Sequence, residues 1–145
     1  MTEPSPRGLR RDYKAFRALA TRWADNDVYG HVNNVVAYAL FDSAVNGHLV
    51  LAGVLDLETS PTIGLVVESA CRYHAPMAFP DLIHAGLRVA HLGRSSVAYE
   101  IGLFRNDEDV AAAEGRFVHV YVDRATRRPC PIPDPTRALL ATLKP

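Results

Sequence analysis

The chain has 145 residues, which is enough for one domain with a hydrophobic core and too few for two. Its 16 basic residues balance 16 acidic ones, so charge gives no reason to expect a nucleic acid or a membrane surface as partner. The two cysteines form neither a CxxC pair nor a zinc-ligand spacing, and no run approaches the roughly 18 apolar residues of a membrane span. We therefore expect a cytoplasmic protein whose partners are small molecules or copies of itself.

The N-terminal segment has little structural pattern. Residues 1–11 contain two prolines, a glycine and several charges, and they lack the apolar core of a signal peptide. We expect a flexible tail here, so that residues 12–145 form a single domain. Apolar and polar residues roughly alternate over residues 12–23, which predicts a strand.

A segment crowded with polar groups follows, from Arg22 to Asn34, and reads RWADNDVYGHVNN. It combines two carboxylates, one imidazole and two amides around one glycine: Asp25, Asp27, His31, Asn33, Asn34 and Gly30. Burying so many polar groups together is costly unless they serve a purpose. The glycine can adopt backbone angles that other residues resist, which suits a tight turn. We therefore expect the functional site in this segment.

The next segment has the period of a helix. Apolar residues recur at steps of three and four, at Val35, Tyr38, Phe41, Val45, Leu49 and Ala52. This spacing predicts a helix of about five turns over residues 34–52, buried on most of its surface. Asn33 or Asn34 can cap its first turn, and Gly53 can end it.

Beyond residue 62 the apolar period changes to two. Four segments rich in Val, Leu, Ile, Tyr and Phe have the length of strands: residues 63–74, 82–92, 96–105 and 110–122. The short turns at residues 93–95 and 106–109 predict hairpins, and the linker at residues 75–81 is expected to cross to another strand. Asp134, as a cap before Pro135, predicts a short terminal helix over residues 135–143.

Together these elements predict an α+β fold in which an antiparallel sheet of about five strands wraps around one long central helix. A single helix cannot cover both faces of such a sheet. An uncovered face or edge is therefore expected to meet a second copy of the chain, which predicts a homodimer.

The residues also carry a resemblance to a known family. The segment from Trp23 to Asn34, followed by Tyr38, Phe41, Asp42 and Ala44, resembles the signature of hotdog-fold acyl-CoA thioesterases of the 4-hydroxybenzoyl-CoA thioesterase-like family. Residues 67–73 and 89–96, with Pro76 and Asp81, resemble the central strands of that family, so the match covers about residues 13–122. The resemblance implies a hotdog fold, a dimer or a dimer of dimers, and hydrolysis of an acyl-CoA to a carboxylic acid and CoA without metal or organic cofactor.

The resemblance implies a catalytic carboxylate at Asp27 and a thioester carbonyl held by the backbone amide of Asn34. Chemistry supports both roles, because free N–H groups at a helix N-terminus stabilise negative charge on a carbonyl oxygen. A carboxylate opposite that carbonyl can attack it directly or deprotonate a water molecule, and the sequence leaves both routes open. The acyl group, and the choice between CoA and an acyl-carrier protein, also stay open.

Other residues of the segment and the strands receive secondary roles. Asp25 is expected to hold the loop, and His31 is a catalytic candidate for which a loop-ordering hydrogen bond is the stronger interpretation. The resemblance implies that Glu68 and Ser69 face the site across a dimer interface, and a surface position or an ion pair is an equally supported interpretation of Glu68. Arg94 and Ser95 lie in a hairpin where related proteins contact CoA phosphates, and a solvated turn is the stronger interpretation of Ser95. The expected substrate-binding residues are therefore Gly30, Asn33, Tyr38, Glu68, Ser69, Arg94 and Ser95.

Spacing argues against several alternatives. An EF-hand loop would need an acidic or amide residue at Tyr29 and a glutamate at Val36, so calcium is excluded. A phosphatase-type Asp-x-Asp site normally belongs to a longer, doubly wound domain. A divalent metal held by Asp25, Asp27 and His31 has no second ligand cluster to support it. Two further functions stay open: a hotdog enoyl-CoA hydratase and a non-catalytic acyl-CoA-binding module. The hydratases of this fold pair an Asp and a His five residues apart around an Asn-Pro, a spacing that Asp27 and His31 do not have.

Overall fold

The computed structural model describes residues 6–145; the first five residues of the expected tail lie outside the described residues. The described part contains a five-stranded sheet, two α-helices and two single-turn 3-10 helices. In chain order these are a 3-10 turn at Arg10–Asp12, β1 (Ala15–Ala20), a 3-10 turn at Trp23–Asp25, α1 (Asn34–Leu51), β2 (Thr62–Tyr73), β3 (Leu82–Leu92), β4 (Ser96–Arg105), β5 (Ala113–Asp123) and α2 (Asp134–Ala141).

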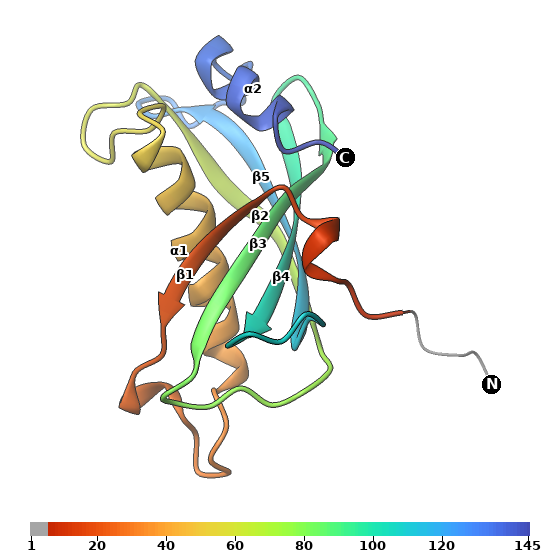
Figure 1. Cartoon of the computed structure of the whole chain (residues 1–145). Coiled ribbons are helices and arrows are strands. Elements are labelled where there is room, and N and C mark those ends of the chain that lie inside the picture. The colour runs from red at the N-terminus through yellow and green to blue at the C-terminus, as the bar shows by residue number, and fades with distance from the viewer. Residues whose placement is uncertain (1–5) are drawn as a thin grey trace, which may run out of the picture.

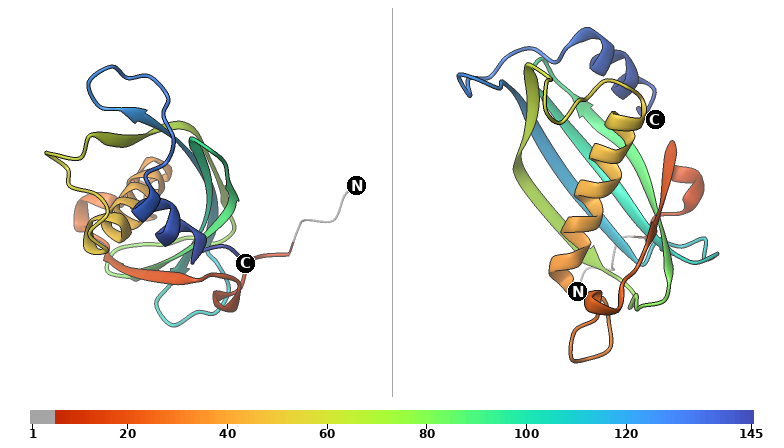
Figure 2. Two further views of the ribbon diagram at one scale, coloured as in Figure 1. Left: turned by 90° about the horizontal axis from the view of Figure 1, so that it is seen from above. Right: turned by 90° about the vertical axis from the view of Figure 1, so that its left-hand side faces the viewer.

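The sheet is antiparallel throughout, with the strand order β1-β3-β4-β5-β2. It curves around α1, which runs along the inner face of the sheet (Figures 1 and 2). β2 forms one edge, and the linker from β2 to β3 crosses β5 and β4, as its length predicts. The two predicted hairpins join β3 to β4 and β4 to β5. The expected α+β arrangement around one long helix is therefore present.

α1 begins and ends where the sequence predicts. The side chain of Asn33 caps its first turn by accepting the N–H of Val35 at 3.0 Å, and Gly53 follows its end with a φ of 78°. The ring of Phe41 lies directly on Gly115 of β5, where a Cβ atom would collide with three ring carbons. The glycine therefore lets the helix approach the sheet closely, and Phe41 is fully buried.

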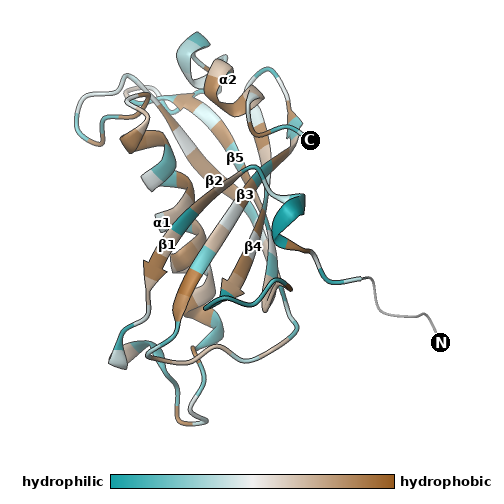
Figure 3. Ribbon diagram, in the orientation of Figure 1, coloured by the Kyte–Doolittle hydropathy of each residue, from teal (hydrophilic) through white to brown (hydrophobic). Residues whose placement is uncertain are grey.

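Apolar residues lie along the strands and on α1, whereas the turn at Arg10–Asp12 is hydrophilic (Figure 3). The helix contributes six buried residues to the core: Ala37, Leu40, Phe41, Ala44, Val45 and Leu49. β3, β4 and β5 supply the fully buried partners on the inner face, among them Leu87, Ile101 and Leu103. Within residues 6–145, no helix is long and apolar enough to cross a membrane.

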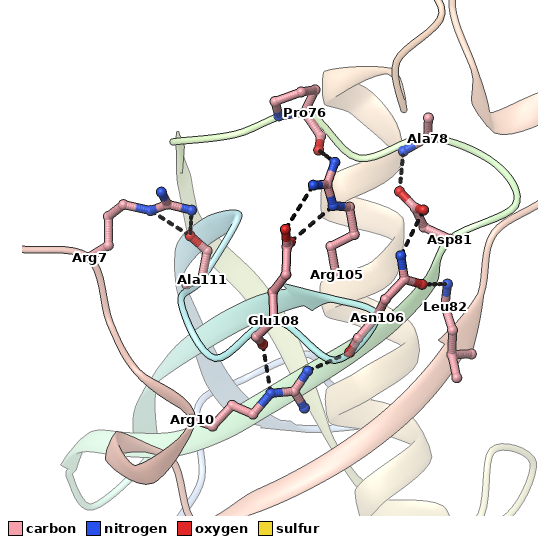
Figure 4. A network of polar contacts seen from close by, with 10 residues as sticks. All are labelled: Arg7, Arg10, Pro76, Ala78, Asp81, Leu82, Arg105, Asn106, Glu108 and Ala111. Atoms are coloured by element: carbon pink, nitrogen blue, oxygen red, sulfur yellow. Dashed lines mark hydrogen bonds and ion pairs between the residues drawn. The ribbon is translucent and has the colours of Figure 1, made fainter.

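Residues 7–11 of the expected tail contact the rest of the domain. The Arg7 guanidinium donates to the carbonyl of Ala111 at 2.6 and 2.9 Å, and Leu9 forms a β-bridge with Val110 (Figure 4). Arg10 donates to the carbonyls of the turn between β4 and β5. Arg7 and Arg10 therefore hold this segment against the connection between β4 and β5.

The same turn holds the linker between β2 and β3 (Figure 4). The Arg105 guanidinium donates to the carbonyl of Pro76 at 3.1 Å and pairs with Glu108 at 2.8 Å. The side chain of Asn106 donates to the Asp81 carboxylate at 3.0 Å and accepts the N–H of Leu82 at 2.9 Å. These bonds fix the linker at both of its ends, next to the start of α1.

Three predicted boundaries are corrected by the structure. β1 covers only residues 15–20, because 3-10 turns replace both ends of the predicted strand. β5 begins at Ala113, since Val110 pairs with Leu9 as an isolated bridge. At α2 the N-cap is Pro133, and Asp134 is the first helical residue with no side-chain capping bond.

Candidate active site

Asp25 anchors the loop that leads into α1. Its side chain is 3% exposed and accepts hydrogen bonds from the backbone N–H of Arg22 at 2.7 Å and from the Arg22 guanidinium at 2.8 and 3.1 Å. Its carbonyl accepts the N–H of Asn33 at 2.9 Å. Burial acts to raise the pKa of Asp25, but the hydrogen bonds from Arg22 outweigh burial and lower that pKa. Asp25 therefore has the structural role that its position predicts.

A tight turn from Asp27 to His31 presents the second carboxylate. The N–H of Asp27 donates to the carbonyl of His31 at 2.8 Å, and Gly30 has a φ of 79°, a conformation that favours glycine. The Oδ1 atom of Asp27 accepts the N–H of Tyr29 at 2.9 Å and the N–H of His31 at 3.4 Å. The loop backbone thus fixes the direction of the half-buried Asp27 carboxylate.

The first residue of α1 offers a free amide. The side chain and the carbonyl of Asn33 accept the N–H groups of Val35 and Val36, at 3.0 and 2.9 Å. Within residues 6–145, no acceptor contacts the backbone N–H of Asn34. The hydroxyl of Tyr73, on β2, donates to the carbonyl of Asn34 at 2.9 Å and ties the first turn of α1 to the edge strand. A helix N-terminus with an unused donor is suited to holding a developing oxyanion.

Asp27 and Asn34 line the same two neighbouring clefts. The larger, of about 840 Å³, is also lined by Trp23, Asn26, Val28, Tyr29, Gly30 and Asn33. The other, of about 410 Å³, is also lined by His31, Val32, Tyr73, His74, Ala75, Pro76 and Met77. A group placed between the two clefts therefore lies between the carboxylate and the start of the helix.

The linker between β2 and β3 supports this arrangement. The N–H of Val32 donates to the carbonyl of Met77 at 2.6 Å, and the N–H of Phe79 donates to the side chain of Asn26 at 2.9 Å. The ring of Phe79 also packs edge-on against Trp23, with centroids 6.0 Å apart. The loop that carries Asp27 is thus held on one side by α1 and on the other by the linker.

Several of the predicted site residues line the clefts beside Asp27: Asn34, His31, Gly30 and Asn33. Tyr38 lies one turn into α1 and lines neither of these two clefts. His31 is exposed and contacts Asp27 through its backbone rather than its ring. Tyr38 packs edge-on against Phe41 with ring centroids 5.7 Å apart.

The two predicted residues of β2 lie on opposite faces of that strand. Glu68 pairs in register with Val118 and forms an ion pair with Arg116 at 3.4 Å. Because the neighbouring position 115 faces Phe41 of α1, alternation along β5 turns Arg116 and its partner Glu68 to the outer face, away from Asp27. Ser69 is exposed on the inner face, near the middle of the strand.

Arg94 and Ser95 lie at the opposite end of the sheet from Asp27. The carbonyl of Ser95 accepts the N–H of Tyr121, which pairs with Gly64 at the start of β2. Tyr73, at the other end of β2, contacts the start of α1. Roughly nine residues of strand separate Gly64 from Tyr73, so the two ends are about 30 Å apart. A single chain therefore does not bring Arg94 and Ser95 to the Asp27 site.

The sequence did not reveal Tyr73 and Met77 as site residues. Burial, followed by the neighbouring Cys71 and Tyr38, raises the pKa of Tyr73, which keeps its hydroxyl protonated as a donor to Asn34. Alternation places Tyr73 on the inner face of β2, but its contact with α1 depends on the curvature of the sheet. Within the described residues, no three His, Cys, Asp or Glu side chains lie close enough together to hold a metal ion.

Comparison with known proteins identifies the family. Residues 21–140 match the family model described as the thioesterase-like superfamily. The chain belongs to this superfamily. A comparison with curated protein sequences gave no match.

Several solved structures share the architecture. The PA5185 protein of Pseudomonas aeruginosa strain PAO1 is 55% identical, with a TM-score of 0.94, over 96% of this chain and 97% of that one. PA2801 of Pseudomonas aeruginosa, named as a candidate thioesterase, is 31% identical with a TM-score of 0.80, over 87% and 97% of the two chains. Slr0204 of Synechocystis, a 1,4-dihydroxy-2-naphthoyl-CoA thioesterase, is 16% identical with a TM-score of 0.78, over 87% and 94%, a likeness that shows the fold alone.

These findings confirm the hotdog fold and the family that the sequence resembles. The protein is a thioester hydrolase.

Proposed function

We propose that this thioesterase hydrolyses an acyl-CoA in the space shared by Asp27 and the start of α1, releasing a carboxylic acid and CoA. The observation that carries the proposal is that Asp27 and Asn34 line the same two clefts, while the N–H of Asn34 has no acceptor within residues 6–145. The reaction uses water and the groups of the protein, without metal or organic cofactor.

The thioester carbonyl oxygen accepts the N–H of Asn34 and lies at the positive end of α1. This position stabilises the negative charge that develops when the carbonyl carbon is attacked. In one route the Asp27 carboxylate takes a proton from water, hydroxide adds to the carbonyl carbon, and collapse of the tetrahedral intermediate expels CoA thiolate, which recovers the proton. In the other, the carboxylate attacks directly and expels the thiolate, and water then hydrolyses the mixed anhydride.

A homodimer is part of the proposal, with β2 as the interface. β2 is a 12-residue edge strand, and the middle of it is open to solvent: Leu65, Val66 and Val67 are 38, 47 and 61% exposed. A long apolar edge invites pairing with another strand. Two copies of β2 paired antiparallel about a two-fold axis would join the sheets into one.

The dimer would also complete the site. Pairing centred on the middle of β2 places Thr62 opposite the partner's Tyr73, so the start of β2 lies beside the partner's Asp27 cleft. The predicted phosphate contacts, Arg94 and Ser95, belong to that same end of the sheet. An acyl-CoA bound by Asp27 of one subunit would therefore meet Arg94 of the other.

Replacement of Asp27 by asparagine tests the mechanism. The amide side chain in the Asp27→Asn variant would keep an oxygen that accepts the N–H groups of Tyr29 and His31, so the loop should stay folded. We expect thiol release from a panel of acyl-CoAs to fall by about 100-fold or more, because asparagine is neither a base nor a nucleophile here. Asp107→Asn, the same change on an exposed turn, serves as the matched control.

The outcomes separate the proposal from its alternatives. Wild-type-like hydrolysis by Asp27→Asn would remove this carboxylate from the mechanism. Hydration of crotonyl-CoA by the wild-type protein would favour the hydratase, and tight acyl-CoA binding without thiol release would favour a binding module. Sedimentation equilibrium of the wild-type protein tests the dimer.

A further inference from the structure

A small cavity lies at the end of the sheet away from Asp27 and is not used by the proposed mechanism. Its volume is about 190 Å³, and it opens between the second half of α1, the loop that follows α1, the start of β2 and the end of β5. Part of its wall is apolar and is formed by Leu49, Leu55, Leu57 and Ile63. The polar part of the wall is formed by Asn46, His119, Tyr121 and Arg124. An apolar cavity of about 150 Å³ is known to accept a benzene molecule, so this one has room for a group of ring size.

His119, on β5, is the unusual residue of the wall. It is only 2% exposed, and its ring lies 4.6 Å from that of Phe117 and 5.4 Å from that of Tyr99. Its Nε2 atom is buried without a hydrogen-bond partner within residues 6–145. Burial lowers the pKa of His119 to about 4, so the imidazole is neutral near pH 7.

Gly64 leaves the other ring nitrogen uncovered. Gly64 on β2 pairs with Tyr121 on β5, and a Cβ atom at Gly64 would lie 3.2 Å from Nδ1 of His119. Any larger residue at this position would therefore cover Nδ1, whereas glycine leaves this side of the ring open toward the cavity. The cation of the wall is already engaged, since the Arg124 guanidinium donates to the carbonyls of Ser60 and Leu57. The neutral imidazole is thus one of the uncharged polar groups that a ligand would meet, beside those of Asn46 and Tyr121.

We propose that this cavity binds a compact apolar group that carries a hydroxyl, with Nδ1 of His119 as the hydrogen-bond partner and Gly64 as the residue that gives access. A neutral imidazole has one donor and one acceptor nitrogen, and a hydroxyl can satisfy either form of Nδ1 because it both donates and accepts. A charged group is disfavoured, because the wall is largely apolar and offers no free opposite charge among the described residues.

The ligand group is assigned as the far end of the acyl chain, and this assignment rests on the proposed function and its dimer. In the proposed pairing, Thr62 lies opposite the partner's Tyr73, and Gly64 is two residues further along the strand. One strand spacing across and two residues along together place Gly64 about 8 Å from the partner's Tyr73. The partner's Tyr73 contacts the start of its own α1. A thioester held there can extend a compact acyl group into the cavity, so His119 and Gly64 become determinants of acyl specificity.

A binding experiment tests the cavity without requiring hydrolysis. Phenol and toluene, which differ by hydroxyl against methyl, are titrated into the full-length protein while the side-chain ¹⁵N resonances of His119 are followed by NMR. We expect saturable binding of phenol with a shift of the Nδ1 resonance, and binding at least about 10-fold weaker for toluene. Gly64→Ala should weaken phenol binding by covering Nδ1. His119→Phe, followed through the backbone amide resonances of the cavity wall, should abolish the preference for phenol. His119→Leu, which also lacks a hydrogen-bonding side chain, replaces His119→Phe if that variant does not fold.

A hydrolysis experiment tests the assignment to the acyl group. Thiol release is compared for 4-hydroxyphenylacetyl-CoA and 4-methylphenylacetyl-CoA. We expect kcat/KM to favour the hydroxylated substrate by about 10-fold or more, and we expect His119→Phe to remove this preference.

The outcomes distinguish this proposal from the proposed function. Equal kcat/KM values for the two substrates in the wild-type protein would overturn the assignment and leave the thioesterase mechanism intact. Phenol binding that leaves the His119 resonances unchanged would overturn the cavity site itself. A wild-type protein that cleaves neither substrate would contradict the acyl assignment, and the phenol titration would still decide whether the cavity is a binding site.

Discussion

Acid should destabilise this protein through His119. The perturbation is a fall in pH from 7 to 5, compared between the wild-type protein and His119→Phe. The imidazole has an ordinary pKa of 6.5, and burial lowers its pKa to about 4 in the folded state. Between these two values the unfolded chain binds a proton that the folded chain does not bind. The free energy of unfolding therefore increases with pH in this window. The stability that the neutral His119 contributes at pH 7 is lost as the pH falls from 6.5 toward 4.

The size of the effect follows from the two pKa values. Integrating the difference in bound protons gives a loss of about 2 kcal/mol between pH 7 and pH 5, and about 3 kcal/mol by pH 4. The neighbouring tyrosines do not titrate in this window, because burial raises the pKa of Tyr121 to about 12 and also raises the pKa of Tyr99 well above its ordinary value. His119 is almost fully buried, so solvent screening does not reduce the effect as it would at the surface.

Urea unfolding at pH 7 and pH 5 measures this loss. Carboxylates such as Asp25 also titrate toward acid pH, so the informative quantity is the difference in unfolding free energy between the wild-type protein and His119→Phe at each pH. Phenylalanine does not titrate, so any change in packing that it brings contributes equally at both pH values. We expect the wild-type protein to lose about 2 kcal/mol relative to the variant on going from pH 7 to pH 5. Parallel pH dependence of the two proteins would show that His119 is not held neutral by burial.

Three further predictions concern the helix contact, the edge strand and the loop. Gly115→Ala should lower the free energy of unfolding by about 1–3 kcal/mol in urea, because the added Cβ would collide with the ring of Phe41. Phe41→Leu should lower the free energy of unfolding less in the Gly115→Ala protein than in the wild-type protein. Val67→Asp should convert the proposed dimer to monomer in sedimentation and reduce thiol release, whereas a dimer that survives the charge would locate the interface elsewhere. Asp25→Ala should cost about 1–3 kcal/mol in the same unfolding assay by leaving the N–H of Arg22 without its acceptor, and an unchanged unfolding midpoint would contradict the anchoring role of Asp25.

The elements that local pattern specifies were predictable from the sequence. The apolar spacing over residues 34–52, with Asn33 before it and Gly53 after it, predicts α1 almost to the residue. The predicted bounds of β3 and β4 coincide with those of the structure, because turn residues stand at both ends of each strand. The prediction for β1 was too long, since alternation continues through residues that the structure folds into 3-10 turns.

The parts of the site that depend on strand order were not predictable in this way. Alternation places Tyr73 on one face of a strand, but only the curvature of the sheet brings its hydroxyl to Asn34. Likewise, Gly64 and His119 are far apart in the chain, and only the pairing of β2 with β5 reveals that the glycine uncovers the imidazole. Nor does any local pattern separate Glu68, on the outer face, from Ser69, on the inner one.

The proposed dimer accounts for exposed apolar groups at both ends of the molecule. Val28 and Tyr29, at the tip of the Asp27 turn, are 93 and 83% exposed, and Leu57, in the loop that follows α1, is 68% exposed. These groups lie at opposite ends of α1, so a single chain cannot bury them against each other. Antiparallel pairing of two β2 strands would set the Asp27 turn of one subunit beside the loop after α1 of the other. This contact would cover the exposed apolar residues of the turn and of the loop, together with the apolar edge formed by Val66 and its neighbours. The two-fold axis of the proposed dimer would also join the Asp27 cleft of one subunit to the His119 cavity of the other, so assembly and substrate recognition would depend on one interface.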